Sequence, residues 1–247
     1  SILAEEIIVS ATRPIDKSNM ANSNFTQQAI AKTNLGPDLP ILMTQTPSLV
    51  SSSDAGTGIG YTNFRIRGTD ANRINITVNG IPMNDAESHG VYWVNMPDFA
   101  SSVENIQIQR GIGTSTNGSG AFGATINMQT EQLNKSAYAE LSGSAGSFNT
   151  YKYTAKAGTG LIKNHFAFDM RLSQITSDGY VDRASSDLKS YYVSGGYYSK
   201  NSIIKFIHFS GKEKTYQSWW GVPKVRLEND SVGMQRYEDH WLYTHDQ

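Results

Sequence analysis

The sequence has no cysteine among its 247 residues. Disulfide scaffolds, thiolate zinc sites and cysteine nucleophiles are therefore excluded. A surplus of positive charge is missing as well, because 21 lysines and arginines face 22 aspartates and glutamates. This balance argues against a protein dedicated to nucleic-acid binding, which usually carries a basic excess.

Long apolar runs are also absent from the sequence. A transmembrane helix needs ~20 consecutive apolar residues, so a helix that spans a membrane is excluded. Transmembrane β-strands stay possible, because they alternate apolar and polar residues and hydropathy hardly detects them.

Residues 1–130 predict a small α+β domain. Helices are expected over residues 26–32 and from Asp38 onward, with a stop at Pro47. Asn79-Gly80 predicts a hairpin turn. Strands are expected over residues 63–68, 73–78, 103–108 and 124–128, irregular chain over residues 14–24, and a loop over residues 51–60.

Residues 131–247 alternate apolar and polar residues almost strictly. About five strands of ~10 residues are expected, the length that a tilted membrane-crossing strand needs. Two connections near 158–164 and 199–201 are short, and the one over 175–187 is longer, which is the asymmetry of outer-membrane barrels. A soluble β-sandwich also alternates in this way, and aromatic side chains on one face favour the barrel.

Residues 118–123 fit the pattern G-x-G-x-x-G of dinucleotide-binding proteins. That motif should follow a strand and open a helix, whereas here it precedes a β-prone segment. A tight glycine turn is the alternative interpretation. The nucleotide-enzyme hypothesis would require a helix to begin at this motif.

Residues 84–93 combine charged, imidazole and aromatic side chains. Oxygen and nitrogen donors at this density could bind a metal ion, but no second ligand cluster supports a metal site. A solvated loop is the alternative, and exposed aromatic residues often form recognition surfaces. The segment is therefore the expected substrate-contact loop, with contacts from Asp85, Glu87, His89, Tyr92 and Trp93.

Four ordered motifs resemble the plug domain of TonB-dependent outer-membrane receptors. They are Phe64-Arg65-Ile66-Arg67-Gly68, Ile76-Thr77-Val78-Asn79-Gly80-Ile81-Pro82, residues 103–111 and residues 118–127. The segment 84–98 is similar to receptors of the Bacteroidetes group that are assigned to siderophore uptake. The resemblance implies a plug domain over residues 1–130 and the first strands and loops of a transmembrane β-barrel over residues 131–247.

The resemblance also implies residue roles. Residues 5–11 correspond in position and texture to the Ton box, which pairs with the periplasmic protein TonB. The TonB-contact residues would be Glu5, Glu6, Ile7, Ile8, Val9, Ser10 and Ala11. Arg67 and Arg110 correspond to plug arginines that pair with carboxylates of the barrel wall. Glu104 belongs to the same lock, whose charge pattern differs here because Gln107 replaces a second carboxylate.

The implied function is active import of a ferric siderophore or related iron chelate, without enzymatic activity, cofactor or bound metal. Cobalamin or haem is the alternative substrate, and a passive porin or surface-binding protein is the alternative class. Implied partners are TonB with ExbB and ExbD, outer-membrane lipids, the metal chelate and a surface lipoprotein. Since family barrels have about 22 strands, the chain is expected to be the N-terminal portion of a larger receptor with an incomplete barrel.

Overall fold

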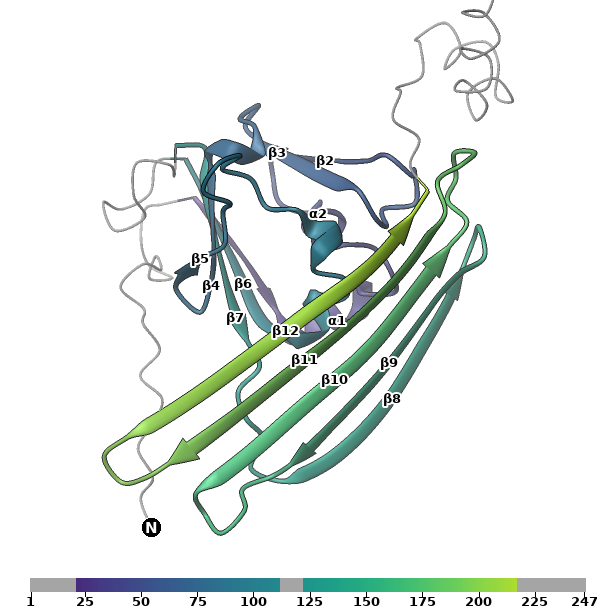
Figure 1. Ribbon diagram of the computed structural model, residues 1–247. Helices are drawn as coiled ribbons and strands as arrows, with labels where there is room; N and C mark the ends of the chain where they lie inside the picture. The colour runs from purple at the N-terminus through teal and green to yellow at the C-terminus, as the bar shows by residue number, and fades with distance from the viewer. Residues whose placement is uncertain (1–20, 112–121, 217–247) are drawn as a thin grey trace, which may run out of the picture.

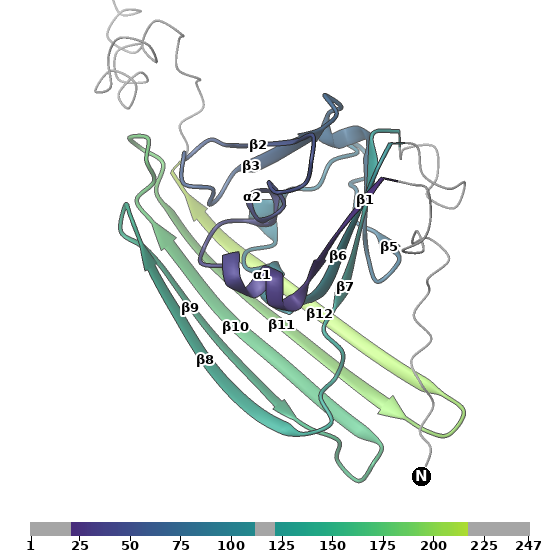
Figure 2. The ribbon, with the colours of Figure 1, turned by 180° about the vertical axis from the view of Figure 1, so that it is seen from behind.

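A computed structural model describes residues 21–111 and 122–216. Five long antiparallel strands form a curved sheet, here called the wall, and the preceding residues form an inner domain on its concave side (Figure 1). Figure 2 shows the same arrangement from behind, with α1 lying between the wall and the sheet of the inner domain. In the described ranges, no helix is long and apolar enough to cross a membrane.

The inner domain contains short strands and helices in mixed order. They are β1 (Asn22–Thr26), α1 (Gln27–Thr33), α2 (Leu39–Leu42), β2 (Leu49–Ser53), β3 (Thr62–Ile66), η2 (Ala71–Arg73), β4 (Ile74–Val78), β5 (Ile81–Pro82), η3 (Trp93–Asn95), η4 (Phe99–Ser102), β6 (Val103–Arg110) and β7 (Ala124–Thr130). One sheet has the order β1-β6-β7-β4-β5, and β2 pairs with β3 separately.

The core of the inner domain follows the predicted alternation of its strands. Ile74 and Ile76 of β4, Ile106 and Ile108 of β6, and Ile126 of β7 are all at most 1% exposed. Strands that present branched apolar residues at every second position bury one complete face. The expected strands are confirmed, and α1 and α2 confirm the two expected helices, although α2 ends at Leu42, before the predicted stop at Pro47.

The predicted hairpin turn connects β4 to β5. Val78 pairs with Ile81, and the two residues between them have φ values of 51° at Asn79 and 81° at Gly80. Positive φ at both central positions defines the turn type whose twist matches a hairpin, and asparagine and glycine tolerate it best.

The wall consists of β8 (Ala137–Gly146), β9 (Thr150–Thr159), β10 (Phe166–Ser177), β11 (Ser186–Tyr198) and β12 (Ile203–Thr215). Each strand pairs with its sequence neighbour in an unbroken antiparallel register. On β10, Phe168 is 49% and Leu172 50% exposed, whereas Arg171 is 2% and Ala167 1% exposed. The five predicted strands and the apolar outer face are thus confirmed.

Several predicted boundaries were wrong. Residues 22–24 belong to β1, because backbone pairing with β6 includes this polar segment. Residues 51–53 belong to β2, which pairs with β3. The long wall connection spans only residues 178–185, and residues 147–149 form a shorter turn at the same end of the wall. The asymmetry between the two ends is therefore weaker than expected.

The glycine motif lies mostly outside the described residues. Its end at Gly123 leads directly into β7, which runs from Ala124 to Thr130. A strand at this position contradicts the nucleotide-binding hypothesis, which requires a helix to begin there.

Candidate functional site

A buried carboxylate connects the inner domain to the wall. Asp98 precedes η4 in a left-handed conformation with φ 53°. Its carboxylate lies 2.6 Å from the Lys152 ammonium on β9 and 3.2 Å from the Arg171 guanidinium on β10. The three side chains are 0%, 6% and 3% exposed, respectively, so the cluster is shielded from water. We call Asp98, Lys152 and Arg171 the ion cluster.

Hydrogen bonds satisfy most of the remaining donors and acceptors of these charges. The Asp98 carboxylate accepts from the hydroxyl of Thr154 at 3.0 Å and from the hydroxyl of Ser173. Lys152 donates to the backbone and side-chain oxygens of Asn34 at 3.0 and 2.8 Å, and Arg171 donates to the backbone oxygen of Asp98. Such bonds offset the cost of burying the charges, and the Arg171 Nε–H is the donor of the cluster that stays buried without a partner.

The electrostatics of Asp98 show that the cluster favours the ionised form. Burial alone raises the pKa of this carboxyl, but the charges of Lys152 and Arg171 outweigh the burial and hold the pKa at about 2. Asp98 is therefore ionised in the folded protein at neutral pH.

A second ion pair lies nearer the start of the wall. Glu131, directly after β7, lies 2.7 Å from the Lys156 ammonium of β9. Its carboxylate also accepts a hydrogen bond of 2.6 Å from the amide of Gln27 on α1. In both ion pairs the carboxylate comes from the inner domain or from the residue directly after it, and the cation comes from the wall.

The predicted lock residues lie elsewhere. Arg67 is exposed at the end of β3 with φ 53°, and Arg110 donates to the Pro47 oxygen at 3.4 Å. Glu104 of β6 is half-buried and lines a cavity of about 460 Å³ together with Glu131. Within the described part of the chain, none of these three forms an ion pair with the wall. Their role in a lock stays a prediction.

Sequence reasoning missed Asp98. It is the last residue of the segment 84–98, whose resemblance to known receptors assigns it no role, and its partners lie 54 and 73 positions away in the sequence. A partial signal existed on the wall side, because strict alternation places Lys152 and Arg171 on the inward face of their strands. Where the inner domain covers these cations, it must also supply an anion, and Asp98 is that anion.

The expected substrate-contact loop is held by its own hydrogen bonds. The Asp85 carboxylate accepts from the backbone N–H of Glu87 at 3.1 Å and from that of Ser88 at 2.7 Å. These bonds lower the pKa of Asp85. Asp85 therefore shapes the turn, whereas Glu87 and His89 are exposed beside it.

The two aromatic residues of this loop have different environments. Trp93 is 3% exposed and packs against Phe64 with ring centroids 6.1 Å apart. Tyr92 is 54% exposed. Both line an open cavity of about 780 Å³ between this loop and β2–β3, whose wall also includes Tyr61, Arg65 and Asp70. Asp85, Glu87 and His89 do not line it, so only part of the predicted set converges.

Two further expectations concern the TonB-contact segment and a bound metal ion. The TonB-contact segment, Glu5 to Ala11, lies outside the described residues. Across residues 21–111 and 122–216, no group of three or more histidine, aspartate or glutamate side chains could hold a metal ion.

Comparisons with known proteins match this architecture. Residues 14–125 match the family model described as the TonB-dependent Receptor Plug Domain. A curated relative, the vitamin B12 transporter BtuB of Vibrio vulnificus, is 26% identical over 179 residues, which are 71% of this chain and 28% of that protein.

Solved structures share the fold. The ferric-catecholate import receptor Fiu of E. coli K12 has a TM-score of 0.70 at 17% identity, covering 92% of this chain and 32% of that one. The pyoverdine-bound receptor FpvA of P. aeruginosa has a TM-score of 0.63 at 16% identity, covering 81% and 26%. The copper transporter OprC has a TM-score of 0.64 at 15% identity, covering 81% and 31%. The chain spans about a third or less of the length of these relatives.

The fold and the interface define an outer-membrane protein in which an inner domain lies against a membrane-spanning β-wall. Residues 14–125 match the plug domain of TonB-dependent receptors, the family that the motifs resemble. Its location is the bacterial outer membrane. The narrower similarity to Bacteroidetes receptors stays a prediction.

Proposed function

We propose that this chain is part of an energy-coupled importer of the outer membrane. The plug domain, which we assign to residues 1–130, blocks the passage inside the barrel whose first strands and loops are residues 131–247. TonB, energised by ExbB and ExbD, pulls on residues 5–11, and the plug domain then moves relative to the wall. The chain catalyses no reaction and needs no cofactor.

The observation that carries this proposal is the ion cluster. An interface made of charges and hydroxyl groups can be separated with less loss than an apolar core, because water replaces each lost hydrogen bond. The contacts of Asp98 with Lys152 and Arg171 therefore suit a plug domain that leaves the wall and returns. A passive porin has no need for such a reversible contact.

The proposed substrate is a ferric siderophore or a related iron chelate, and the similarity to the ferric-catecholate import receptor Fiu supports this class. Cobalamin or haem is the second candidate, and the similarity to the vitamin B12 transporter BtuB favours cobalamin within it. The open cavity of about 780 Å³ beside Tyr92 has the size of a small-molecule site. A surface lipoprotein that covers the receptor is a further candidate partner.

A test of energy coupling changes one residue in the TonB-contact segment of the whole receptor. Strand addition needs backbone N–H donors, and proline has none. Ile8→Pro is expected to abolish uptake, while the control Ile8→Val keeps it. Surface amounts of both variants are compared by immunoblot. Uptake that is unchanged in Ile8→Pro would refute the importer and favour a passive pore.

The substrate is tested separately by growth of a deletion strain under iron restriction. Each candidate chelate is supplied as the sole iron source, and the strain is complemented with the receptor or with the Ile8→Pro variant. Growth that depends on the receptor identifies the chelate. Receptor-dependent uptake of cobalamin or haem, with none of any siderophore, would replace the first substrate by the second.

A further inference from the structure

The outer face of the wall carries an apolar band. On β10 it includes Phe166, Phe168, Met170 and Leu172, which are 43–50% exposed. Ile204 and Phe206 of β12 are 66% and 60% exposed. Apolar side chains that point away from the inner domain on neighbouring strands form the surface that contacts lipid tails.

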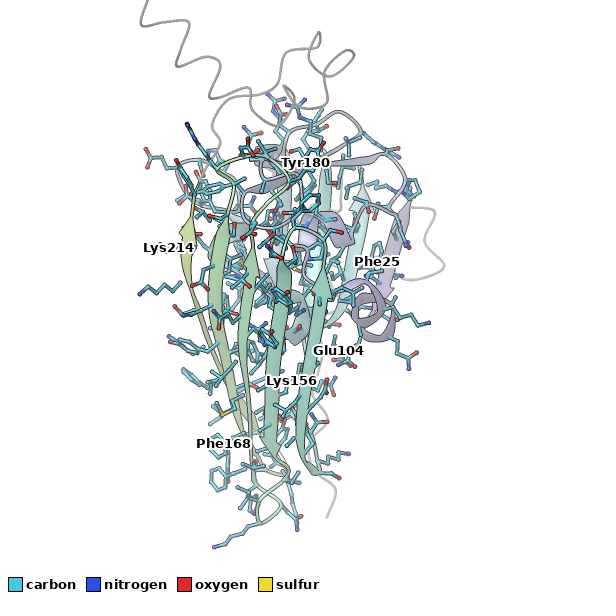
Figure 3. The ribbon with its side chains drawn as sticks, turned by 90° about the vertical axis from the view of Figure 1, so that its right-hand side faces the viewer. Phe25, Glu104, Lys156, Phe168, Tyr180 and Lys214 are labelled. Atoms are coloured by element: carbon cyan, nitrogen blue, oxygen red, sulfur yellow. The ribbon has the colours of Figure 1, made fainter. Side chains whose placement is uncertain are left out.

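Three lysines lie where this band ends on β11 and β12. Strict alternation puts Lys189, Lys212 and Lys214 on the same outward face as Tyr191 and Phe206. Figure 3 shows Lys214 projecting from the outer side of the wall, on the same side as Phe168 and toward the opposite end of the strands. The lysines therefore lie at the boundary between lipid tails and headgroups.

The register of the wall places two of these charges against each other. Lys189 is the direct partner of Lys212, and Lys214 is the direct partner of Asp187. Like charges directly opposite on one face of a sheet are destabilising, so this pair favours a bound anion between its ammonium groups.

The nearby carboxylate does not balance this charge. The Asp187 carboxylate lies 3.9 Å from the Lys189 ammonium, and both side chains are about half exposed, at 42% and 58%. Asp187 also accepts a hydrogen bond of 3.0 Å from the amide of Gln174. Three ammonium groups and one carboxylate leave the patch net positive.

The position of the lysines along the wall determines which leaflet of the membrane they contact. The lysines lie toward the end whose connections span residues 147–149 and 178–185, and the opposite end has connections over residues 160–165 and 199–202. The longest of these four connections, over residues 178–185, is therefore at the lysine end. In outer-membrane barrels the longer connections face the cell exterior. We propose that Lys189, Lys212 and Lys214 bind the phosphate groups of an anionic lipid in the outer leaflet. This inference rests on the outer-membrane location and is independent of the transported substrate.

The test compares two double variants of the whole receptor in uncharged detergent. Lys189→Gln with Lys212→Gln removes the opposed pair. Lys163→Gln with Lys200→Gln removes the same charge from exposed turns at the other end of the wall. Native mass spectrometry and a fluorescence titration measure the binding of lipid A, a phosphorylated outer-leaflet lipid. One lysine near an anionic lipid surface contributes about fivefold in affinity, so the first variant should lose roughly 25-fold.

The expected result is a loss of at least about tenfold for the first variant and none for the control. Binding should also weaken with added salt, since the patch is exposed. Equal affinities for all three proteins would overturn the proposal, as would equal losses in both variants. Inorganic pyrophosphate and lipid A without phosphate form the remaining arms. Saturation by pyrophosphate at the affinity of lipid A would assign the patch to free phosphate instead of lipid.

Discussion

Replacing Asp98 by asparagine should loosen the inner domain from the wall. The change keeps the shape of the side chain and removes its charge, so Lys152 and Arg171 stay buried without an anion. Breaking a buried ion pair on one side costs about 3–5 kcal/mol. Since every 1.4 kcal/mol is a factor of ten, the docked fraction should fall by roughly two to four orders of magnitude.

A matched control variant is Asp70→Asn. Asp70 forms an ion pair of 3.0 Å with Arg65, but the two side chains are 64% and 68% exposed. Exposed pairs contribute about 1 kcal/mol or less. The two variants therefore make the same chemical change at similar separations of charge, and they differ mainly in burial.

The assay measures how fast a buried position becomes reactive. Ser186 of β11 is 6% exposed, and its hydroxyl lies against Gly60 of the inner domain. Ser186→Cys, as the sole cysteine in the whole receptor, should react with a maleimide only when the inner domain leaves the wall. Labelling is followed as a function of urea for the parent, the Asp98→Asn variant and the Asp70→Asn variant.

The pH dependence supplies a second readout for the same variant. The pKa of Asp98 is lowered from 3.8 to about 2 in the folded protein, so the ion cluster contributes its full stability above pH ~4. That contribution is lost as the pH falls from about 4 to about 2. The parent and Asp98→Asn should therefore differ most at neutral pH and converge near pH 2. Equal labelling of the parent, Asp98→Asn and Asp70→Asn at pH 7 would refute the reasoning.

Three further predictions concern other residues. Burial raises the pKa of Asp38 to about 8 in the folded protein. Because this carboxyl ionises at lower pH in the unfolded chain, the free energy of unfolding should fall by about 1.4 kcal/mol per pH unit between pH 4 and pH 8. Asp38→Asn should remove this pH dependence in urea unfolding and stabilise the receptor at pH 8. Trp93→Ala should destabilise the inner domain by about 3–5 kcal/mol in the same assay, whereas Tyr92→Ala should cost under about 1 kcal/mol and weaken only substrate binding, measured by titration. Lys156→Met should increase Ser186→Cys labelling less than Asp98→Asn does, because Lys156 and Glu131 are 15% and 21% exposed.

The wall could be predicted from the sequence because each strand faces two different environments. Lipid contact selects Phe166 and Phe168, and contact with the inner domain selects Arg171 and Ser173. This difference repeats at every second residue, and a period is readable in one sequence. The strand boundaries were less predictable, because backbone pairing extends β10 through Ser177 into a segment with polar side chains.

The candidate site was harder to predict because its contacts join distant segments. Asp98 itself adopts the left-handed conformation that precedes η4, and its two partners come from separate wall strands. No local pattern encodes such a meeting. The motifs instead drew attention to Arg67 and Arg110, for which the described residues provide no partner on the wall.

The two halves of the interface suggest how the plug domain moves. Toward β9 and β10 the contacts are ionic, through Lys152 and Arg171. Toward β12 they are apolar, since the rings of Phe99 and Phe209 lie 4.9 Å apart with their planes tilted by 51°. Water can solvate the separated charges, whereas exposure of the aromatic rings to water is unfavourable. The ionic half of the interface therefore separates with the lower free-energy barrier. A pulling force should therefore open the interface first along β9 and β10, with the apolar contact at β12 acting as the hinge.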